Sequence, residues 1–248
     1  QGRHSGGQVY AWGQRELMAL RSVAFRLVNV GASSLVRDGG RLGYPVCLVC
    51  GQSRSPMASQ ADRDEFAKQH HERCGRQLAP VGFFADVTAD ALCLIRCASR
   101  EEAYSVMESL RKGAAQVLEM EQEDLQLLAV PRDGELHMFL YDPMPGGSGL
   151  LDQMITRFDE VVAAAQELVS GCPGVCKTAC IDCLLHFRNA YYHRHLNRHT
   201  ALGTLRQLGG RLALQNDIPA QLPTVSSGTK PSNDAESTLR TLLLRAGF

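Results

Sequence analysis

The chain has 248 residues, enough for one large domain or two small ones, and its apolar fraction of 44% predicts a buried core. Its 26 basic residues balance its 26 acidic residues, so the overall charge favours neither nucleic acid nor a membrane surface as a partner. No apolar run approaches the roughly 20 residues that span a bilayer, so we expect no membrane partner. Residues 1–7 contain no export signal and no initiator Met, so we expect a cytoplasmic protein and a piece of a longer chain.

The first hundred residues contain two helical patterns and two extended ones. Residues 16–30 place apolar side chains at helical spacing and predict an N-terminal helix. Gly and Ser in residues 31–43 predict a loop, and the polar residues 62–72 predict a second helix. The short apolar runs at residues 81–87 and 91–97 predict a pair of strands.

The next part of the chain alternates helices and strands. Ser99 opens a capping box and predicts a helix that ends near residue 120. Strands are predicted at residues 125–130 and 136–141, and an apolar stripe predicts a helix over residues 150–169. Beyond it lie a cysteine-rich loop and a basic segment.

Four cysteines lie within twelve residues, at Cys172-x3-Cys176-x3-Cys180-x2-Cys183. Four thiolates at this spacing suit a tetrahedral zinc ion, whose Zn–S bonds are about 2.3 Å long. Because all four ligands come from the protein, the pattern predicts a closed, structural site and not a catalytic one. An iron–sulfur cluster is the rival cofactor, and four reduced cysteines without metal are the remaining alternative.

A second set of ligand residues lies upstream, where Cys47 and Cys50 form a CxxC knuckle and His70, His71 and Cys74 follow. Either histidine has a suitable spacing to Cys74, so the sequence leaves the choice open. We expect a second zinc site here. The alternative is a lone knuckle beside solvent-facing histidines.

Three further features have a structural and a functional interpretation. Cys93 and Cys97 lie in an apolar run, four residues apart, and are expected to be core residues on one face of a strand. Residues 146–149, Gly-Gly-Ser-Gly, lie between a strand and a helix, where they predict either a turn capped by Ser148 or a cradle for an anion. No Lys-Ser/Thr follows these glycines, so they are not a phosphate-binding P-loop.

Residues 186–199 contain no acidic side chain and alternate basic with aromatic residues. Such a strip can contact phosphates and stack on bases, or it can be a solvated helix beside the metal loop. For the first interpretation we expect nucleic-acid contacts from Arg188, His193, Arg194, Arg198 and Arg206.

Residues 140–150, in which a strand enters a Gly-rich turn and a helix, are followed about twenty residues later by the four cysteines. The combination resembles the MrfA zinc-binding (MZB) domain family, found at the C-terminal end of certain superfamily 2 DEAD/DEAH-type DNA helicases and in the DrmB protein of the DISARM antiphage system. The continuation over residues 179–189, with His193 and residues 196–198, is most similar to the DrmB-like branch. The resemblance spans roughly residues 80–210, although many relatives have a tighter first cysteine pair.

The resemblance implies that Cys172, Cys176, Cys180 and Cys183 bind one zinc ion and that the domain works beside an ATP-dependent helicase, in cis or in trans. The motor is absent from this sequence, so we expect no catalysis from the chain alone. The implied function is a helicase accessory domain in antiphage defence or DNA repair, which supports DNA binding or motor docking. The alternative is an interaction scaffold that docks a helicase subunit without contacting DNA.

The expected fold is therefore α+β, with a small sheet of about four strands flanked by helices. Three parts are expected. Residues 1–79 hold the N-terminal helix and the possible zinc knuckle, and residues 80–212 form the MZB-like zinc domain. Residues 213–248 form a linker and a short C-terminal helix.

Overall fold

The computed structural model describes residues 5–29, 43–54, 58–132 and 134–220, and it has the expected α+β fold. The main sheet is antiparallel throughout, with strand order β6-β7-β5-β2-β1-β8. Its strands are β1 Gly7–Trp12, β2 Arg15–Asn29, β5 Phe83–Cys97, β6 Gln126–Arg132, β7 Glu135–Tyr141 and β8 Leu212–Ile218. A second sheet pairs β3 Tyr44–Val46 with β4 Ala79–Val81. The expectation of about four strands is wrong, since the main sheet has six.

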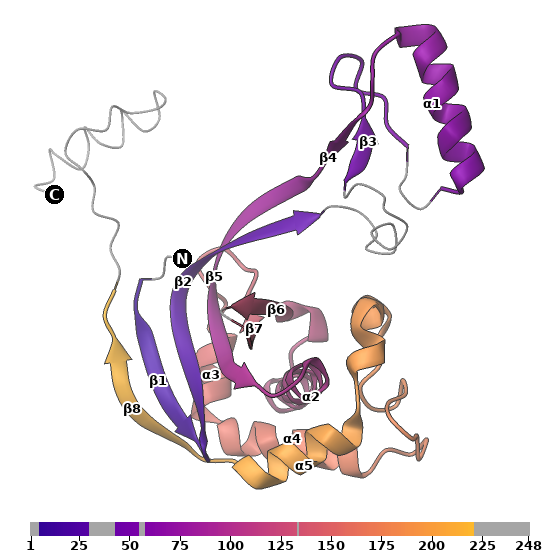
Figure 1. Cartoon of the computed structure of the whole chain (residues 1–248). Helices are drawn as coiled ribbons and strands as arrows, with labels where there is room; N and C mark the ends of the chain where they lie inside the picture. Colours follow the sequence, from indigo (N-terminus) through magenta and orange to yellow (C-terminus); the bar gives the residue numbers. More distant parts are fainter. Residues whose placement is uncertain (1–4, 30–42, 55–57, 133, 221–248) are drawn as a thin grey trace, which may run out of the picture.

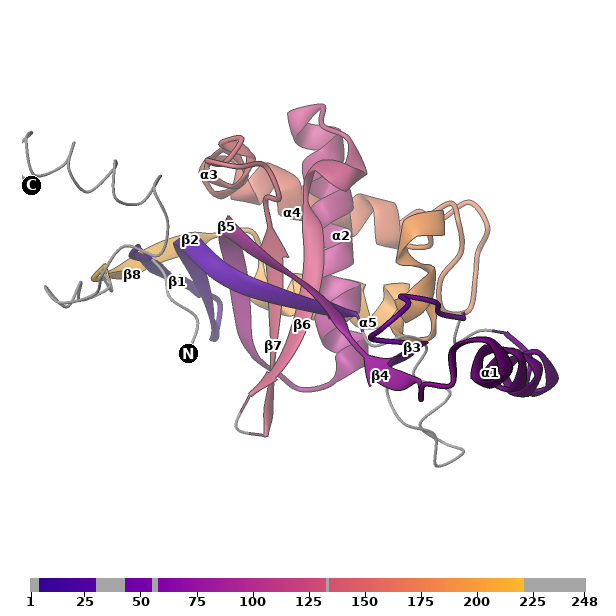
Figure 2. The ribbon, with the colours of Figure 1, turned by 90° about the horizontal axis from the view of Figure 1, so that it is seen from above.

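Helices α2, α3, α4 and α5 cover one face of the main sheet (Figure 2). The α-helices are α1 Gln60–Cys74, α2 Arg100–Leu118, α3 Leu150–Thr156, α4 Phe158–Ser170 and α5 Arg198–Leu208, and the 3-10 helices are η2 Gln122–Asp124 and η3 Phe187–His195. Gly113 lets α2 and α4 approach closely, because a Cβ there would lie 2.5 Å from the Val161 carbonyl oxygen. Among the described residues, no helix is both long and apolar enough to cross a lipid bilayer.

The predicted N-terminal helix over residues 16–30 is wrong, because this segment is strand β2. Leu17 packs toward the helices, whereas Val23 and Phe25 pack in the smaller cluster on the opposite face of the sheet. The register shifts between Leu20 and Val23, and Ser22 has a φ of 48°. A bulge of this kind reverses which side chains face the core, so the segment lacks a continuous period of two and imitates a helix.

The two short strands predicted at residues 81–87 and 91–97 are one long strand, β5. Asp90 lies between the two apolar runs, and its carboxylate has partners within the sheet. Its Oδ1 accepts the backbone N–H of Ser22 at 2.8 Å, and its Oδ2 accepts from Arg21 at 2.9 Å. The bulge in β2 thus provides the hydrogen-bond donors for the carboxylate of Asp90, which lies in the middle of β5. The helix predicted at residues 150–169 is also divided, into α3 and α4.

The far ends of β2 and β5 extend beyond the main body and carry β3, β4 and α1, and we call this extension the arm (Figure 1). Residues 31–43 were expected to be a loop, and 31–42 lie outside the described residues. The predicted tail is a strand at its start, since β8 covers Leu212–Ile218. The predicted short C-terminal helix lies outside the described residues.

Candidate metal centres

The four predicted cysteine ligands converge on one point, which we call the four-cysteine site. Cys172 follows the end of α4, and Cys183 precedes the buried Leu184. Tight turns connect them, with the Val175 N–H donating to the Cys172 carbonyl and the Leu185 N–H donating to the Cys180 carbonyl. The loop is held against the helical layer at both ends, so the positions of the sulfurs are set by the fold.

The sulfur–sulfur distances fit a single tetrahedral ion. Cys172 Sγ lies 3.4 Å from Cys180 Sγ and 3.7 Å from Cys176 Sγ, and Cys183 Sγ lies 3.6 Å from Cys176 Sγ and 3.9 Å from Cys180 Sγ. A tetrahedron with Zn–S bonds of about 2.3 Å has edges of about 3.8 Å. A disulfide needs about 2.05 Å, and all nine cysteines are free.

The thiols of this loop compete for protons. The neighbouring Cys172 sulfur, with help from burial, raises the pKa of Cys180 to about 12. Burial opposes ionisation of Cys172, but hydrogen bonds from the Cys180 thiol and the backbone of Cys176 lower its pKa to about 7. The sulfurs therefore do not all ionise on their own at neutral pH. A divalent cation at their centre would ionise all of them, so the donor set fits such an ion.

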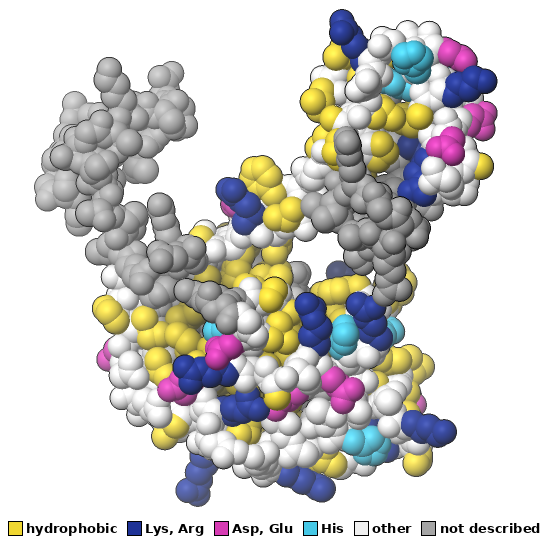
Figure 3. All heavy atoms as spheres, in the orientation of Figure 1, with side chains coloured by type: hydrophobic (Ala, Val, Ile, Leu, Met, Phe, Trp, Pro, Cys, Tyr) yellow, Lys and Arg dark blue, Asp and Glu magenta, His cyan; other side chains and the backbone are white. Residues whose placement is uncertain are grey.

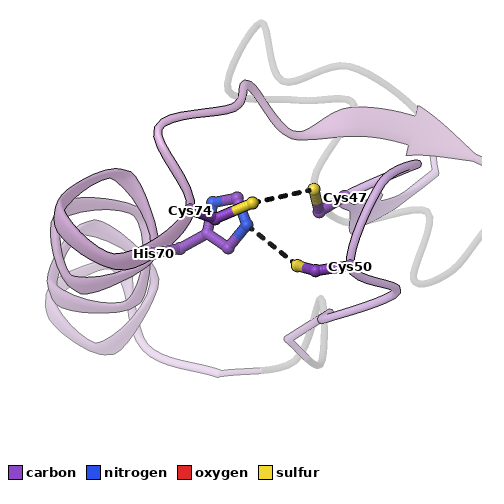
Figure 4. Close-up of side chains that lie close together, drawn as sticks. All are labelled: Cys47, Cys50, His70 and Cys74. Atoms are coloured by element: carbon purple, nitrogen blue, oxygen red, sulfur yellow. Dashed lines mark hydrogen bonds between the residues drawn. The ribbon is translucent and has the colours of Figure 1, made fainter.

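A second group of ligand atoms lies in the arm, and we call it the knuckle site. It consists of Cys47, Cys50, His70 and Cys74 (Figure 4), whose ligand atoms all lie within 4.8 Å of one another. Cys50 Sγ is 3.3 Å from His70 Nε2, and Cys47 Sγ is 3.9 Å from Cys74 Sγ. Backbone hydrogen bonds from Cys50 and Val49 lower the pKa of Cys47 to about 6, which favours its thiolate. Three sulfurs and one imidazole suit a zinc ion.

The structure distinguishes the two candidate histidines. His70 is 2% exposed and lies on the same face of α1 as Cys74, four residues later. His71 is exposed and lies outside the group, because one further residue turns its side chain by about 100° around the helix. Including His71 among the ligands is therefore not supported by its placement.

The comparisons with known proteins support the four-cysteine site. The sequence model of the family described as "MrfA Zn-binding domain" matches residues 106–184, from within α2 to just past Cys183. The match contains all four cysteines of the site. Residues 106–184 are therefore similar to an MZB domain.

Two curated proteins are similar to this chain in sequence. The Druantia protein DruE of Escherichia coli (strain UMEA 4076-1) is 26% identical over 231 residues, covering 78% of this chain and 12% of that protein. The uncharacterized ATP-dependent helicase YprA of Bacillus subtilis (strain 168) is 28% identical over 108 residues, covering 39% of this chain and 14% of that protein. The chain thus spans a small part of each relative.

A solved structure shares the fold. The crystal structure of the DUF1998 helicase MrfA bound to DNA matches with a TM-score of 0.51 and 14% identity. The match covers 84% of this chain and 24% of that chain. The MrfA structure therefore contains a similar arrangement of strands and helices.

The other two cysteines that were considered are core residues, as predicted, but they do not share a face. Cys97 belongs to the core beneath the helices and Cys93 to the cluster on the opposite face. Arg96 has a φ of 55°, and the register shifts between Leu94 and Cys97, so a bulge reverses the alternation. Burial raises the pKa of Cys93 and raises that of Cys97 to about 12, which keeps both thiols protonated.

The basic strip predicted after the MZB domain is split between η3 and α5. Arg188, Arg194 and Arg206 are exposed, whereas Arg198 is 8% exposed and donates to backbone carbonyls. His193 Nε2 lies 2.6 Å from Asn189 Oδ1. Arg198 is therefore a structural residue, and its expected contact with nucleic acid is not supported by its placement.

A buried carboxylate that the sequence did not reveal attaches η3 to α2. Glu108 is fully buried and pairs with Arg111 at 2.6 Å. It also accepts the Tyr192 hydroxyl at 2.8 Å and the Asn189 amide at 3.0 Å. The only sequence signal is the spacing of Glu108 and Arg111, one helical turn apart on a helix with few surface positions.

In the Gly-rich loop before α3, the hydrogen-bond donors that could hold an anion are bonded to the carboxylate of Asp142. Asp142 is 1% exposed, and its carboxylate accepts the N–H of Met144 together with the N–H and the hydroxyl of Ser148. Ser148 Oγ also accepts the Leu150 N–H at 3.3 Å. Because Asp142 takes up these donors, the segment is a turn and not an anion cradle. The predicted cap by Ser148 is wrong, since the N-cap of α3 is Gly149 and no side-chain hydrogen bond caps this helix.

Proposed function

We propose that this chain is a zinc-binding accessory region of an ATP-dependent DNA helicase and that it contacts DNA through η3. The four-cysteine site is the observation that carries the zinc assignment, because its geometry suits one ion and the MZB match includes all of its ligands. The names of YprA and MrfA support the helicase context. The motor lies in cis or in trans to these residues.

We propose two zinc ions, one in the four-cysteine site and one in the knuckle site. In each site the four ligand atoms lie within 4.8 Å of one another, which suits a single ion. An iron–sulfur cluster distributes its four thiolates over different irons and would hold the sulfurs further apart. The compact donor sets therefore favour zinc.

The exposed side of η3 supports a DNA contact. The side chain of Arg188 is 70% exposed, and Tyr191 is 71% exposed. Both residues line a cleft of about 390 Å³. The cleft also includes Tyr141 and Gln126. Aromatic rings beside a guanidinium suit bases and phosphates. On the face shown in Figure 3 the surface is hollowed between the main body and the arm, and basic side chains lie among hydrophobic ones.

A salt titration tests the DNA contact. Fluorescence anisotropy of a labelled oligonucleotide with the full chain should give an affinity that falls linearly with salt on logarithmic axes. Arg188→Ala and Arg194→Ala should each weaken binding and reduce the slope by about one. Lys68→Ala, which removes an exposed cation from α1, is the matched control and should change little. Absence of binding at low salt would contradict the DNA contact.

The second candidate function is a scaffold that docks a helicase subunit. Apolar side chains on the arm favour it, since Val28, Phe83 and Phe84 are 61%, 55% and 63% exposed. Exposed apolar groups in one place suit a protein partner. In that case the chain should bind the motor subunit and no oligonucleotide.

The organisation and the wider assignment remain predictions. The division at residues 79/80 and 212/213 is a proposal, and the pairing of β2 with β5 favours a main body that also includes residues from before residue 79. The DrmB-like, DISARM assignment and the cytoplasmic location are predictions as well.

A further inference from the structure

Two buried cations from different helices lie against the loop of the four-cysteine site. Lys112 of α2 is 9% exposed, and its Nζ donates to the carbonyl oxygen of Cys183 at 2.6 Å and to that of Leu185 at 3.3 Å. Nothing in the amphipathic pattern of α2 requires a lysine here. Its ammonium group holds the backbone of one of the four ligand residues.

Arg198 makes the matching contact from the other side of the loop. Its Nε donates to the carbonyl oxygen of Cys176 at 3.0 Å, and its Nη1 donates to that of Val169 at 2.9 Å. Its own backbone N–H donates to the Thr178 carbonyl at 2.7 Å. Arg198 is the first residue of α5, and it therefore joins this helix to the end of α4 and to the loop of the four-cysteine site.

Neither cation has a carboxylate partner in the part of the chain that the structure describes. No ion pair within 4.0 Å includes Lys112 or Arg198, and the nearby Glu108 is paired with Arg111. Buried charges without a partner are costly, typically by several kcal/mol per ion. Two such charges beside one loop indicate that the loop itself carries negative charge.

A metal-loaded four-cysteine site would supply that charge. One Zn²⁺ ion with four thiolates has a net charge of −2, and Lys112 and Arg198 together contribute +2. The other nearby charges are at the surface: Asp182 lies 3.6 Å from Cys180 Sγ and is exposed, as is Lys177. The buried charges thus balance only when the ion and the four thiolates are present.

We propose that Lys112 and Arg198 are the counter-ions of the metal–thiolate centre. They position two of the ligand residues through their carbonyl groups and offset the negative charge of the sulfurs. This inference rests on the proposed metal binding at the four-cysteine site. The knuckle site has one thiolate fewer, and no Lys or Arg among the described residues of the arm is buried, so it is an internal reference.

The test is Lys112→Met in the full chain, with zinc release followed by a chromophoric chelator. His70→Ala identifies the zinc ion of the knuckle site, since that variant loses it. Lys112→Met should raise the dissociation constant of the other zinc ion about 10- to 100-fold. The knuckle site should be unchanged. Lys177→Met, which removes an exposed cation from the same loop, is the matched control and should behave as the wild type.

A conservative variant separates charge from packing. Lys112→Arg keeps the positive charge and should retain most of the wild-type zinc affinity. If Lys112 acted only through packing, Lys112→Arg and Lys112→Met should both weaken zinc binding. Arg198→Met is the second variant, in case Lys112→Met does not fold, and should weaken the same site. An unchanged four-cysteine site in Lys112→Met, or equal weakening of both sites, would overturn the proposal. A wild-type chain without zinc at the four-cysteine site would instead refute the proposed function.

Discussion

Gly174 is the residue on which the geometry of the four-cysteine site depends most closely. A Cβ at this position would lie 3.0 Å from Asp182 Oδ2 and 3.1 Å from Cys180 Sγ. Gly174→Ala should therefore displace a ligand sulfur and weaken zinc binding, measured by competition with a chelator. Gly203→Ala is the control, because a Cβ there meets nothing within 4 Å on helix α5. Equal zinc affinity in both variants would show that the loop can accommodate a Cβ at residue 174, which would contradict this prediction.

His70 and His71 provide a second prediction at the scale of single residues. His70→Ala should reduce the zinc content from two ions per chain to one, because it removes a buried ligand of the knuckle site. His71→Ala should leave both ions in place, since His71 is exposed. Metal analysis of the two purified variants distinguishes them. Loss of zinc from His71→Ala would reverse the assignment.

The ligand residues could be predicted from the sequence, but the residues that support them could not. The spacing of the cysteines and histidines predicted both groups of candidate ligands that the fold brings together, because four ligands for one ion must lie close together along the chain or on short loops. Lys112 and Arg198 have no such spacing signal, since their partners are backbone groups brought near by the fold. Charged residues on predicted helices are ordinarily exposed, and the burial of these two depends on tertiary contacts.

At the scale of elements, Glu108 fixes η3 to α2. Glu108→Gln should destabilise the fold by about 3–5 kcal/mol, because it leaves the Arg111 cation buried without its partner. Urea unfolding followed by circular dichroism measures the change. Glu167→Gln is the control, as Glu167 is exposed on α4. If both variants unfold at the same urea concentration, the buried pair does not hold η3.

The elements themselves were predicted unevenly, and the reason is physical. The helix that begins after Ser99 was predicted correctly. The Ser99 Oγ accepts the Glu102 N–H at 3.0 Å, and a cap of this kind can be predicted because both residues are close in sequence. Strand β2 was not, because the bulge at Ser22 exchanges its two faces and interrupts the alternation. Pairing of β1 with β8, whose partner residues are 200 or more positions apart, has no local signal at all.

For the whole molecule, the two metals should have different effects on stability. The four-cysteine site joins α4, α5 and η3 to the main core, so removing its metal should unfold this MZB-like region cooperatively. Structural zinc contributes about 10–16 kcal/mol of apparent binding free energy, more than most domains have to lose. Removing the metal of the knuckle site should affect only the arm. Thermal unfolding of the wild type and of His70→Ala, with and without chelator, measures both effects.

We propose that one divalent ion held by Cys172, Cys176, Cys180 and Cys183 organises this part of the chain. The most direct test is the metal content of the purified chain and of Cys180→Ser, determined by elemental analysis. We expect two zinc ions in the wild type. In Cys180→Ser we expect a loss of the ion at the four-cysteine site together with a lower soluble yield. A folded wild-type chain that contains no zinc, or contains iron and sulfide in its place, would contradict this proposal.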